Sequence, residues 1–136
     1  LDYEYWKGGK DRTRRSFNPD FFIKLNLDNY IMKINGQAAK NVNRLFELQD
    51  KGIKEVILVV EIKSDDDQEE VTRAKEKAGK EHFAAVNKRL ESINSFDLPE
   101  EYRNSTSQYY IFGLLRPDSY NIWFENLKTG RLKVNF

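Results

Sequence analysis

The chain has no cysteine, a single histidine and three prolines among its 136 residues. The absence of cysteine excludes disulfides and thiolate metal sites, and it fits a reducing compartment. The sequence also lacks a signal peptide and an apolar run long enough to cross a bilayer, so we expect a cytoplasmic protein without a membrane partner. The chain also has no large excess of positive or of negative charge, because its formal net charge is +1. Any contact with nucleic acid must therefore come from local charge.

The composition and length are those of one folded domain. Aromatic residues make up 13% of the chain, which favours a packed globular protein over a disordered one. A chain of this length can bury a hydrophobic core of its own. The sequence opens at Leu1 without a methionine and with strand-like sequence at once. We therefore expect a single domain over residues 1–136 that is part of a longer protein.

The hydrophobic periodicity predicts alternating strands and helices. Strands are expected over residues 2–7, from about 16 to 27, and over 30–34, 55–63 and 108–115. Helices are expected over 38–51 and 67–94, and a last helix should begin near Asp118 and end at Gly130. This order favours an α/β fold, a sheet with helices on both faces. Helical spacing in the long helix predicts a buried stripe of Val71, Ala74, Ala78, His82, Ala85, Val86, Leu90 and Ile93.

The strand over residues 55–63 carries charge at its end. Ile57, Val59, Glu61 and Lys63 share one face, because strand side chains alternate with a period of two. Val56, Leu58, Val60 and Ile62 take the other face, so both faces are apolar at first, as in a strand buried on both sides. Charged groups at the end of such a strand are costly unless they are paired or bind something.

A further carboxylate, Asp20, follows Pro19 at the head of another apolar run. Hard divalent cations such as Mg²⁺ take oxygen ligands, often one or two protein carboxylates with water and substrate phosphate. A metal held in this way lowers the pKa of bound water and neutralises charge on a phosphodiester under attack. Lys63 is suited to orient that water or to stabilise the charge. Asp20, Glu61 and Lys63 are therefore candidate site residues, and the other interpretation is an ion pair of Glu61 and Lys63 with Asp20 as a turn residue.

The residues Pro19-Asp20 followed by Glu61-Ile62-Lys63 resemble the PD-(D/E)xK nuclease signature. The segments 18–23 (Asn-Pro-Asp-Phe-Phe-Ile) and 58–63 (Leu-Val-Val-Glu-Ile-Lys) are similar to the C-terminal endonuclease domain of type III restriction enzymes and of related helicase-associated nucleases. The resemblance continues along most of the chain, through Ala74-Lys75, His82-Phe83, Val86-Asn87 and the segment 110–117.

This resemblance implies a restriction-endonuclease-like fold, a mixed central sheet flanked by helices on both faces. It implies a Mg²⁺-dependent endonuclease, with Mn²⁺ as a substitute, that hydrolyses double-stranded DNA to a 5′-phosphate and a 3′-hydroxyl. Asp20, Glu61 and the main-chain carbonyl of Ile62 would hold the metal, and Lys63 would serve the reaction.

The implied partners are DNA, a helicase or ATPase region of the same chain or complex, and a methyltransferase or specificity subunit of a restriction-modification system. The sequence departs from the family in one respect. The helix that normally precedes the first strand, and often supplies a further glutamate, is not visible.

Five cations gather near the start of the chain: Lys7, Lys10, Arg12, Arg14 and Arg15. One interpretation is a flexible basic hairpin that grips DNA phosphates beside the site, since such contacts position a duplex without reading its sequence. The other is a solvated turn.

Several residues of the long helix allow two interpretations. Lys75 could approach the scissile phosphate as a DNA-binding residue or could be a solvated helix lysine. His82 lies on the expected apolar stripe, so we predict a hydrogen-bonded core histidine rather than a general base. Asp65, Asp66 and Asp67 are expected to cap the helix rather than to bind a second metal. The aromatic residues Tyr109, Tyr110, Phe112, Trp123 and Phe124 are expected in the core rather than stacked on bases.

Two other functional hypotheses remain open from the sequence. The chain could be a catalytically inactive nuclease-like module that binds DNA or docks another subunit, since fold does not fix function. Alternatively, the same three residues could serve a junction-resolving or RNA-directed enzyme.

Overall fold

The computed structural model describes residues 1–7, 11–34, 43–64, 66–95 and 107–130. The elements follow in the order β1 (Asp2–Lys7), β2 (Asp11–Ser16), β3 (Phe21–Asn26), α1 (Leu27–Ile34), α2 (Asn43–Asp50), β4 (Glu55–Ile62), α3 (Glu69–Ser95), β5 (Gln108–Leu115) and α5 (Tyr120–Thr129). The protein is therefore a mixed α/β fold, as predicted. No helix among the described residues is long and apolar enough to span a membrane.

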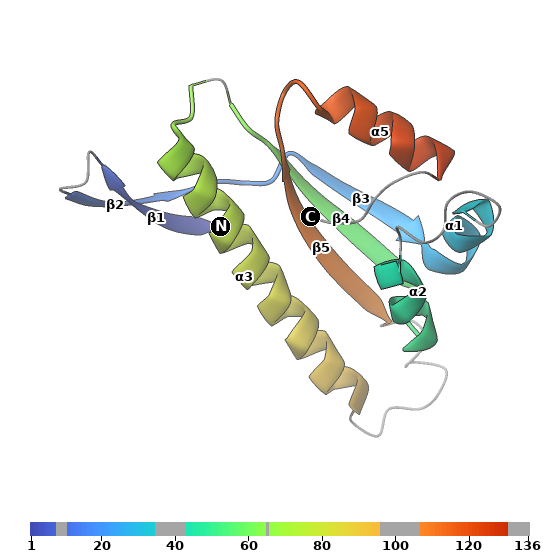
Figure 1. Cartoon of the computed structure of the whole chain (residues 1–136). Helices are drawn as coiled ribbons and strands as arrows, with labels where there is room; N and C mark the ends of the chain where they lie inside the picture. The colour runs from blue at the N-terminus through green and yellow to red at the C-terminus, as the bar shows by residue number, and fades with distance from the viewer. Residues whose placement is uncertain (8–10, 35–42, 65, 96–106, 131–136) are drawn as a thin grey trace.

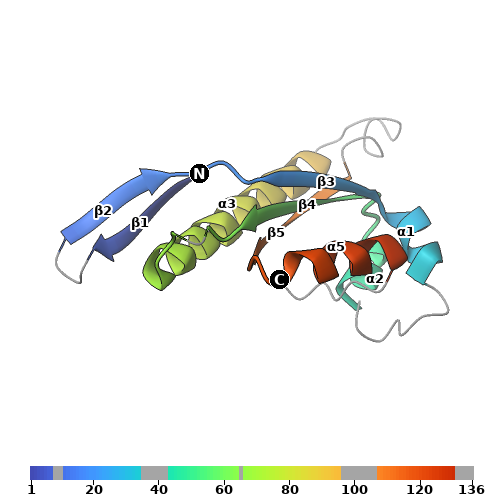
Figure 2. The same ribbon diagram turned by 90° about the horizontal axis from the view of Figure 1, so that it is seen from above.

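The strands form two separate sheets. The larger sheet has the order β3-β4-β5, with β3 antiparallel and β5 parallel to the central strand β4. Helix α3 connects the parallel strands β4 and β5, as crossover connections require. The smaller sheet is the antiparallel hairpin of β1 and β2. Figures 1 and 2 show this hairpin extending away from the larger sheet beside the first turns of α3, which contacts β1.

Helices cover both faces of the larger sheet, and β4 contributes to the core on each (Figure 1). On one face, Val56 and Leu58 pack with residues of α1, α2 and α5. On the other, Ile57 and Val59 pack with Phe83 of α3. The alternation expected for a strand buried on both sides is thus confirmed over β4.

Helix α3 approaches the sheet closely because one of its residues is a glycine. A Cβ added at Gly79 would lie 2.4 Å from the ring of Phe112 on β5, so a larger residue would push the helix outward. Farther along α3, the side-chain amide of Asn87 bonds both main-chain polar groups of Tyr110, donating to its oxygen at 2.8 Å and accepting from its nitrogen at 2.7 Å. Asn87 therefore takes the place of a further strand beside β5 at that position.

The buried face of α3 is rotated relative to the predicted stripe. Thr72, Gly79 and Phe83 are buried, whereas His82 and Ala85 are exposed. The prediction of a core histidine is therefore wrong. The face of α3 that meets the sheet contains a threonine, a lysine and a glycine, so the spacing of apolar residues alone does not identify it.

The expected strand over residues 30–34 is also wrong, because this segment belongs to α1. Leu27, Tyr30 and Ile31 are all buried, at the three- and four-residue spacing of a helix. Asn26 caps the N-terminus of α1, because its side-chain oxygen accepts a hydrogen bond from the main-chain N–H of Asn29 at 3.1 Å. The polar residues Asp28 and Asn29 thus belong to the first turn of α1.

The strand expected from about 16 to 27 is divided, because β2 ends at Ser16, β3 spans Phe21–Asn26, and the two strands belong to different sheets. The remaining elements agree with the sequence predictions, with shifted ends. The predicted helix over 38–51 begins at Asn43 within the described residues, and its stop at Gly52 has a φ of +86°. The last helix ends at Gly130, whose φ of +73° is the left-handed geometry typical of a helix end. Strand β2 begins at Asp11, earlier than expected. Residues 8–10, 35–42, 65, 96–106 and 131–136, which include Asp65 and the start of the helix expected over 38–51, lie outside the described residues.

Candidate active site

Asp20 and Glu61 lie together at the end of β4. Phe21 pairs with Val60 in the antiparallel register, which places the residue before Phe21 beside the residue after Val60. The carboxylate of Asp20 accepts the main-chain N–H of Ile62 at 2.8 Å. This bond fixes the turn after Pro19 against the strand end, so two carboxylates 41 positions apart in the sequence become neighbours.

Glu61 is held in an environment that disfavours its negative charge. Only 6% of its surface is exposed. Burial raises the pKa of Glu61 to about 8, and the hydrogen bond and negative charge of Asp20 act in the same direction. Two close carboxylates cannot both ionise freely without a cation, so one of them retains a proton near neutral pH. The structure thus brings together two oxygen donors at a point where a positive charge would be favourable.

Lys75 of α3 supplies one positive charge to this cluster. Its ammonium bonds the carboxylate of Asp67 at 2.9 Å, and only 14% of its side chain is exposed. Its charge also acts on Glu61, where it opposes the rise in pKa. Burial alone would lower the pKa of Lys75, but the hydrogen bond and charge of Asp67 outweigh burial, and the pKa is raised. Lys75 is therefore a charged, largely buried residue of the site.

Two aromatic rings complete the surroundings of Lys75. Its ammonium lies 5.8 Å from the ring centre of Tyr3 and 5.6 Å from that of Phe17. These distances allow cation–π attraction, which is stronger where the cation is shielded from water. Through these contacts Lys75 connects the hairpin to the end of β4. The interpretation of Lys75 as a solvated helix lysine is thus wrong, whereas its contact with DNA stays a prediction.

Lys63 follows Glu61 by two residues, but its interactions are with groups outside this cluster. Its main-chain N–H donates to Leu115 at 2.7 Å, just beyond the last residue of β4. Its charge lowers the pKa of Glu69 at the start of α3, behind the larger effect of Arg116, which also bonds Glu69. The groups that act on Glu61 are Asp20, Lys75 and Asp67. The ammonium facing Glu61 in this structure is thus that of Lys75.

The donor set fits a hard divalent cation. Asp20 and Glu61 offer carboxylate oxygens, and Ile62 offers its main-chain carbonyl on the side of β4 where its N–H meets Asp20, since both groups of one strand residue point the same way. Among the described residues, no three His, Cys, Asp or Glu side chains form a group that could hold a metal. Protein ligands would therefore number two carboxylates and a carbonyl, and water or phosphate would complete the shell.

Of the three aspartates predicted to cap α3, the structure describes Asp66 and Asp67. The helix begins at Glu69, and Asp67 uses its carboxylate to bond Lys75 rather than to cap the helix. The main-chain N–H of Asp66 donates to the hydroxyl oxygen of Ser64 at 3.3 Å. Asp67 is therefore a residue of the site cluster that the sequence interpretation missed.

The basic residues near the chain start lie largely on β2 and are partly neutralised. Arg12 pairs with Glu4, and Arg14 pairs with Asp2 at 2.8 Å. Because both pairs lie on one face of the hairpin, that face carries balanced charge. Arg15 is exposed on the other face, whereas Lys10 and the side chain of Lys7 lie outside the described residues.

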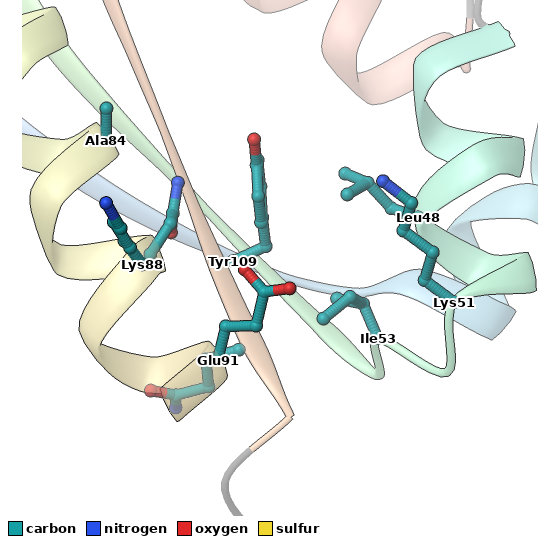
Figure 3. Close-up of a pocket in the computed structure, with 9 residues that line it drawn as sticks. Leu48, Lys51, Ile53, Ala84, Lys88, Glu91 and Tyr109 are labelled. Carbon is teal, nitrogen blue, oxygen red and sulfur yellow. The ribbon is translucent and has the colours of Figure 1, made fainter. Parts of the chain in front are cut away.

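A separate hollow lies at the opposite end of the strands (Figure 3). It is bounded by Leu48 and Lys51 near α2, by Lys88 and Glu91 on α3, and by Tyr109 on β5. Its polar groups are of mixed charge and include a single carboxylate, so it lacks the paired oxygen donors found at Glu61. The Asp20–Glu61 end of the sheet is therefore the stronger candidate for a functional site. Comparisons of the chain with protein-family models, with curated proteins and with solved structures found no significant match.

Proposed function

We propose that this chain is a metal-dependent endonuclease domain that hydrolyses DNA phosphodiester bonds. The proposal rests on one observation, the pair of adjacent carboxylates of Asp20 and Glu61. Glu61 is buried, and its pKa is raised to about 8. Perturbed groups of this kind gather at functional sites because a folded protein otherwise avoids them. The resemblance to PD-(D/E)xK nucleases, and with it a restriction-endonuclease-like fold, agrees with this pair and its position at the end of a central strand.

In the proposed reaction, Asp20, Glu61 and the carbonyl of Ile62 would hold Mg²⁺ or Mn²⁺. When bound, the metal would lower the pKa of water and offset charge on the attacked phosphate. Asp20 is kept in place by the N–H of Ile62, and Glu61 by its position in β4. Lys63, two residues after Glu61, would orient the water or stabilise charge on the phosphate once substrate is bound. Lys75 offsets part of the negative charge of Glu61.

The partners follow from the same resemblance. The proposed substrate is double-stranded DNA, and sequence choice would reside in a helicase or ATPase region and in a methyltransferase or specificity subunit. Arg15, which is exposed, is the described hairpin cation best suited to contact a phosphate, because Arg12 and Arg14 already have carboxylate partners.

The test is cleavage of supercoiled plasmid with Mg²⁺ or Mn²⁺, beside Glu61→Gln prepared in the same way. Glutamine has nearly the same shape as glutamate but is a weaker metal ligand, so the variant should fold and fail to cleave the plasmid. Glu55→Gln is the matched control, since Glu55 lies on the same face at the other end of β4. Nicking by wild type and by Glu55→Gln, but not by Glu61→Gln, supports the proposal. Equal nicking by all three would contradict it.

A second candidate, an inactive module that binds DNA or docks a subunit, is favoured by one observation. Lys75 already places an ammonium beside the buried carboxylates, so the cluster has a counter-ion within the protein. Calorimetric titration with Mn²⁺ separates the two. An endonuclease domain should bind Mn²⁺ in a manner that depends on Glu61, and an inactive module should not.

A further inference from the structure

Phe22 is an unusually exposed aromatic residue next to the candidate site. It exposes 59% of its surface, although phenylalanine is usually buried. It lies on β3 two residues after Asp20, and it pairs with Val59, which lies two residues before Glu61. Side chains two apart on a strand share a face. Phe22 therefore lies on the same face of the sheet as the two carboxylates.

The ring of Phe22 is exposed but well supported from behind. It meets Phe83 of α3 edge to face, with ring centres 6.3 Å apart. Phe83 is buried and stacks in turn on Tyr110 and Phe112 of β5, with ring centres 5.6 and 6.1 Å apart. A ring held by such packing has little freedom to lose when something binds to it, and this lowers the entropic cost of binding.

From this geometry we infer that Phe22 is a stacking platform for an unpaired nucleobase next to the attacked phosphate. The inference rests on the proposed function and narrows its substrate to DNA whose strand is open at the cleavage point. Residues two apart on a strand lie about 7 Å apart, so Phe22 is within reach of a base next to a phosphodiester held at Asp20 and Glu61. A base inside an intact duplex is covered by its neighbours, whereas an unpaired base has a free face that can stack on an aromatic ring.

The neighbouring residue provides a matched control. Phe21 is also exposed, at 44%, but its side chain lies on the opposite face, where it meets Phe124 of α5 with ring centres 5.6 Å apart. Phe21→Ala and Phe22→Ala remove the same ring from adjacent positions of one strand. A general effect on folding or on surface hydrophobicity would follow from both variants, whereas loss of stacking would follow from Phe22→Ala alone.

The test measures binding of the 136-residue chain to fluorescent oligonucleotides in EDTA, so that the readout does not depend on cleavage. The probes are a single strand, a fully paired duplex, and a duplex with a central unpaired stretch. Stacking of one base contributes roughly 1–3 kcal/mol, so Phe22→Ala should weaken binding of the two unpaired probes about tenfold or more. Phe22→Trp should retain tight binding, and Phe21→Ala should change it little.

Several outcomes would overturn the inference: equal affinity of wild type for paired and unpaired probes, equal losses in both alanine variants, no loss in Phe22→Ala, or no binding at all. Cleavage of the same probes with Mn²⁺ separates this inference from the proposed function. Glu61-dependent cleavage that is indifferent to Phe22 would retain the nuclease and remove the stacking platform. Phe22-dependent binding without any cleavage would contradict the nuclease and leave a DNA-binding module.

Discussion

Two glutamates mark the two ends of β4, and their surroundings differ sharply. Glu55, at the start of the strand, receives a hydrogen bond from the side chain of Gln108 at 2.9 Å and pairs with Lys24 at 3.2 Å. The hydrogen bond from Gln108 lowers the pKa of Glu55, with Lys24 acting in the same direction against burial. Glu61, six residues later on the same face, is buried beside a second carboxylate, and its pKa is raised to about 8.

The difference separates a carboxylate whose charge is satisfied by neighbouring groups from one whose charge is disfavoured. At Glu55 the fold supplies donors and a cation, so the charge is satisfied within the protein. At Glu61 the fold supplies another acid and a single lysine shared with Asp67, so part of the electrostatic cost remains. Such incompletely satisfied clusters are typical of sites that gain their missing partner on binding.

The largest expected effect is on cleavage in Glu61→Gln. Removal of a direct metal ligand should lower the cleavage rate by more than the roughly 10–100-fold typical for loss of an outer-shell partner. Glu55→Gln should cut at the wild-type rate. Plasmid-nicking rates measured at saturating Mn²⁺ check both. A comparable loss in both variants would remove the functional distinction between the two ends of β4.

The next largest effect is on stability in Lys75→Met. This change keeps the length of the side chain but leaves Asp67 and Glu61 without their shared cation. Loss of one partner from a buried pair costs about 3 kcal/mol in free energy of unfolding. Urea unfolding should show a lower midpoint with an unchanged slope. Lys77→Met is the control, because Lys77 is an exposed lysine of the same helix and should change stability little. Equal stability of the two variants would show that Lys75 is not part of the cluster.

A third expectation concerns pH. In the unfolded chain Glu61 titrates near 4.5, and in the fold its pKa is about 8, so the folded state binds the proton more tightly. The metal-free protein should therefore be most stable below about pH 4.5 with respect to this group and should lose that contribution as pH rises toward 8. Glu61→Gln should remove this part of the pH dependence in urea unfolding series. Mn²⁺ affinity of the wild type should increase over the same range, because the metal competes with the proton.

The smallest effect is expected in the stability of Glu55→Gln. The pair of Glu55 with Lys24 is partly exposed, and pairs of this kind contribute at most about 1 kcal/mol. The free energy of unfolding, measured by urea titration, should fall by that amount or less, and Lys24→Gln should produce a similar change. A loss as large as that in Lys75→Met would show that the two ends of the strand carry similar electrostatic weight.

The sequence predicts β4, α3, β5 and the last helix because their signals are local. The run Val56 to Val60 is apolar on both faces, and Gly130 follows the last helix where the backbone turns left-handed. A local signal cannot identify an element when the same residues suit two different structures. Asn26, Asp28 and Asn29 suit a turn or a helix start alike, and only the burial of Tyr30 and Ile31 against α2 and the sheet selects the helix.

Within the candidate site, the sequence identifies Asp20 and Glu61 because a carboxylate at the head or the end of an apolar strand is unusual by itself. Their contact, the burial of Glu61, and the addition of Lys75 and Asp67 depend on distant segments that meet only in the fold. A lysine within a helix has no sequence feature that distinguishes a buried from a solvated position. Lys75 lies one helical turn before Gly79, on the face of α3 that meets the sheet, and the rings of Tyr3 on β1 and of Phe17 just after β2 lie beside its ammonium. The sequence alone thus determined which acids stand out, and the tertiary structure decided which cation they meet, because charge interactions depend on distance and burial rather than on order along the chain.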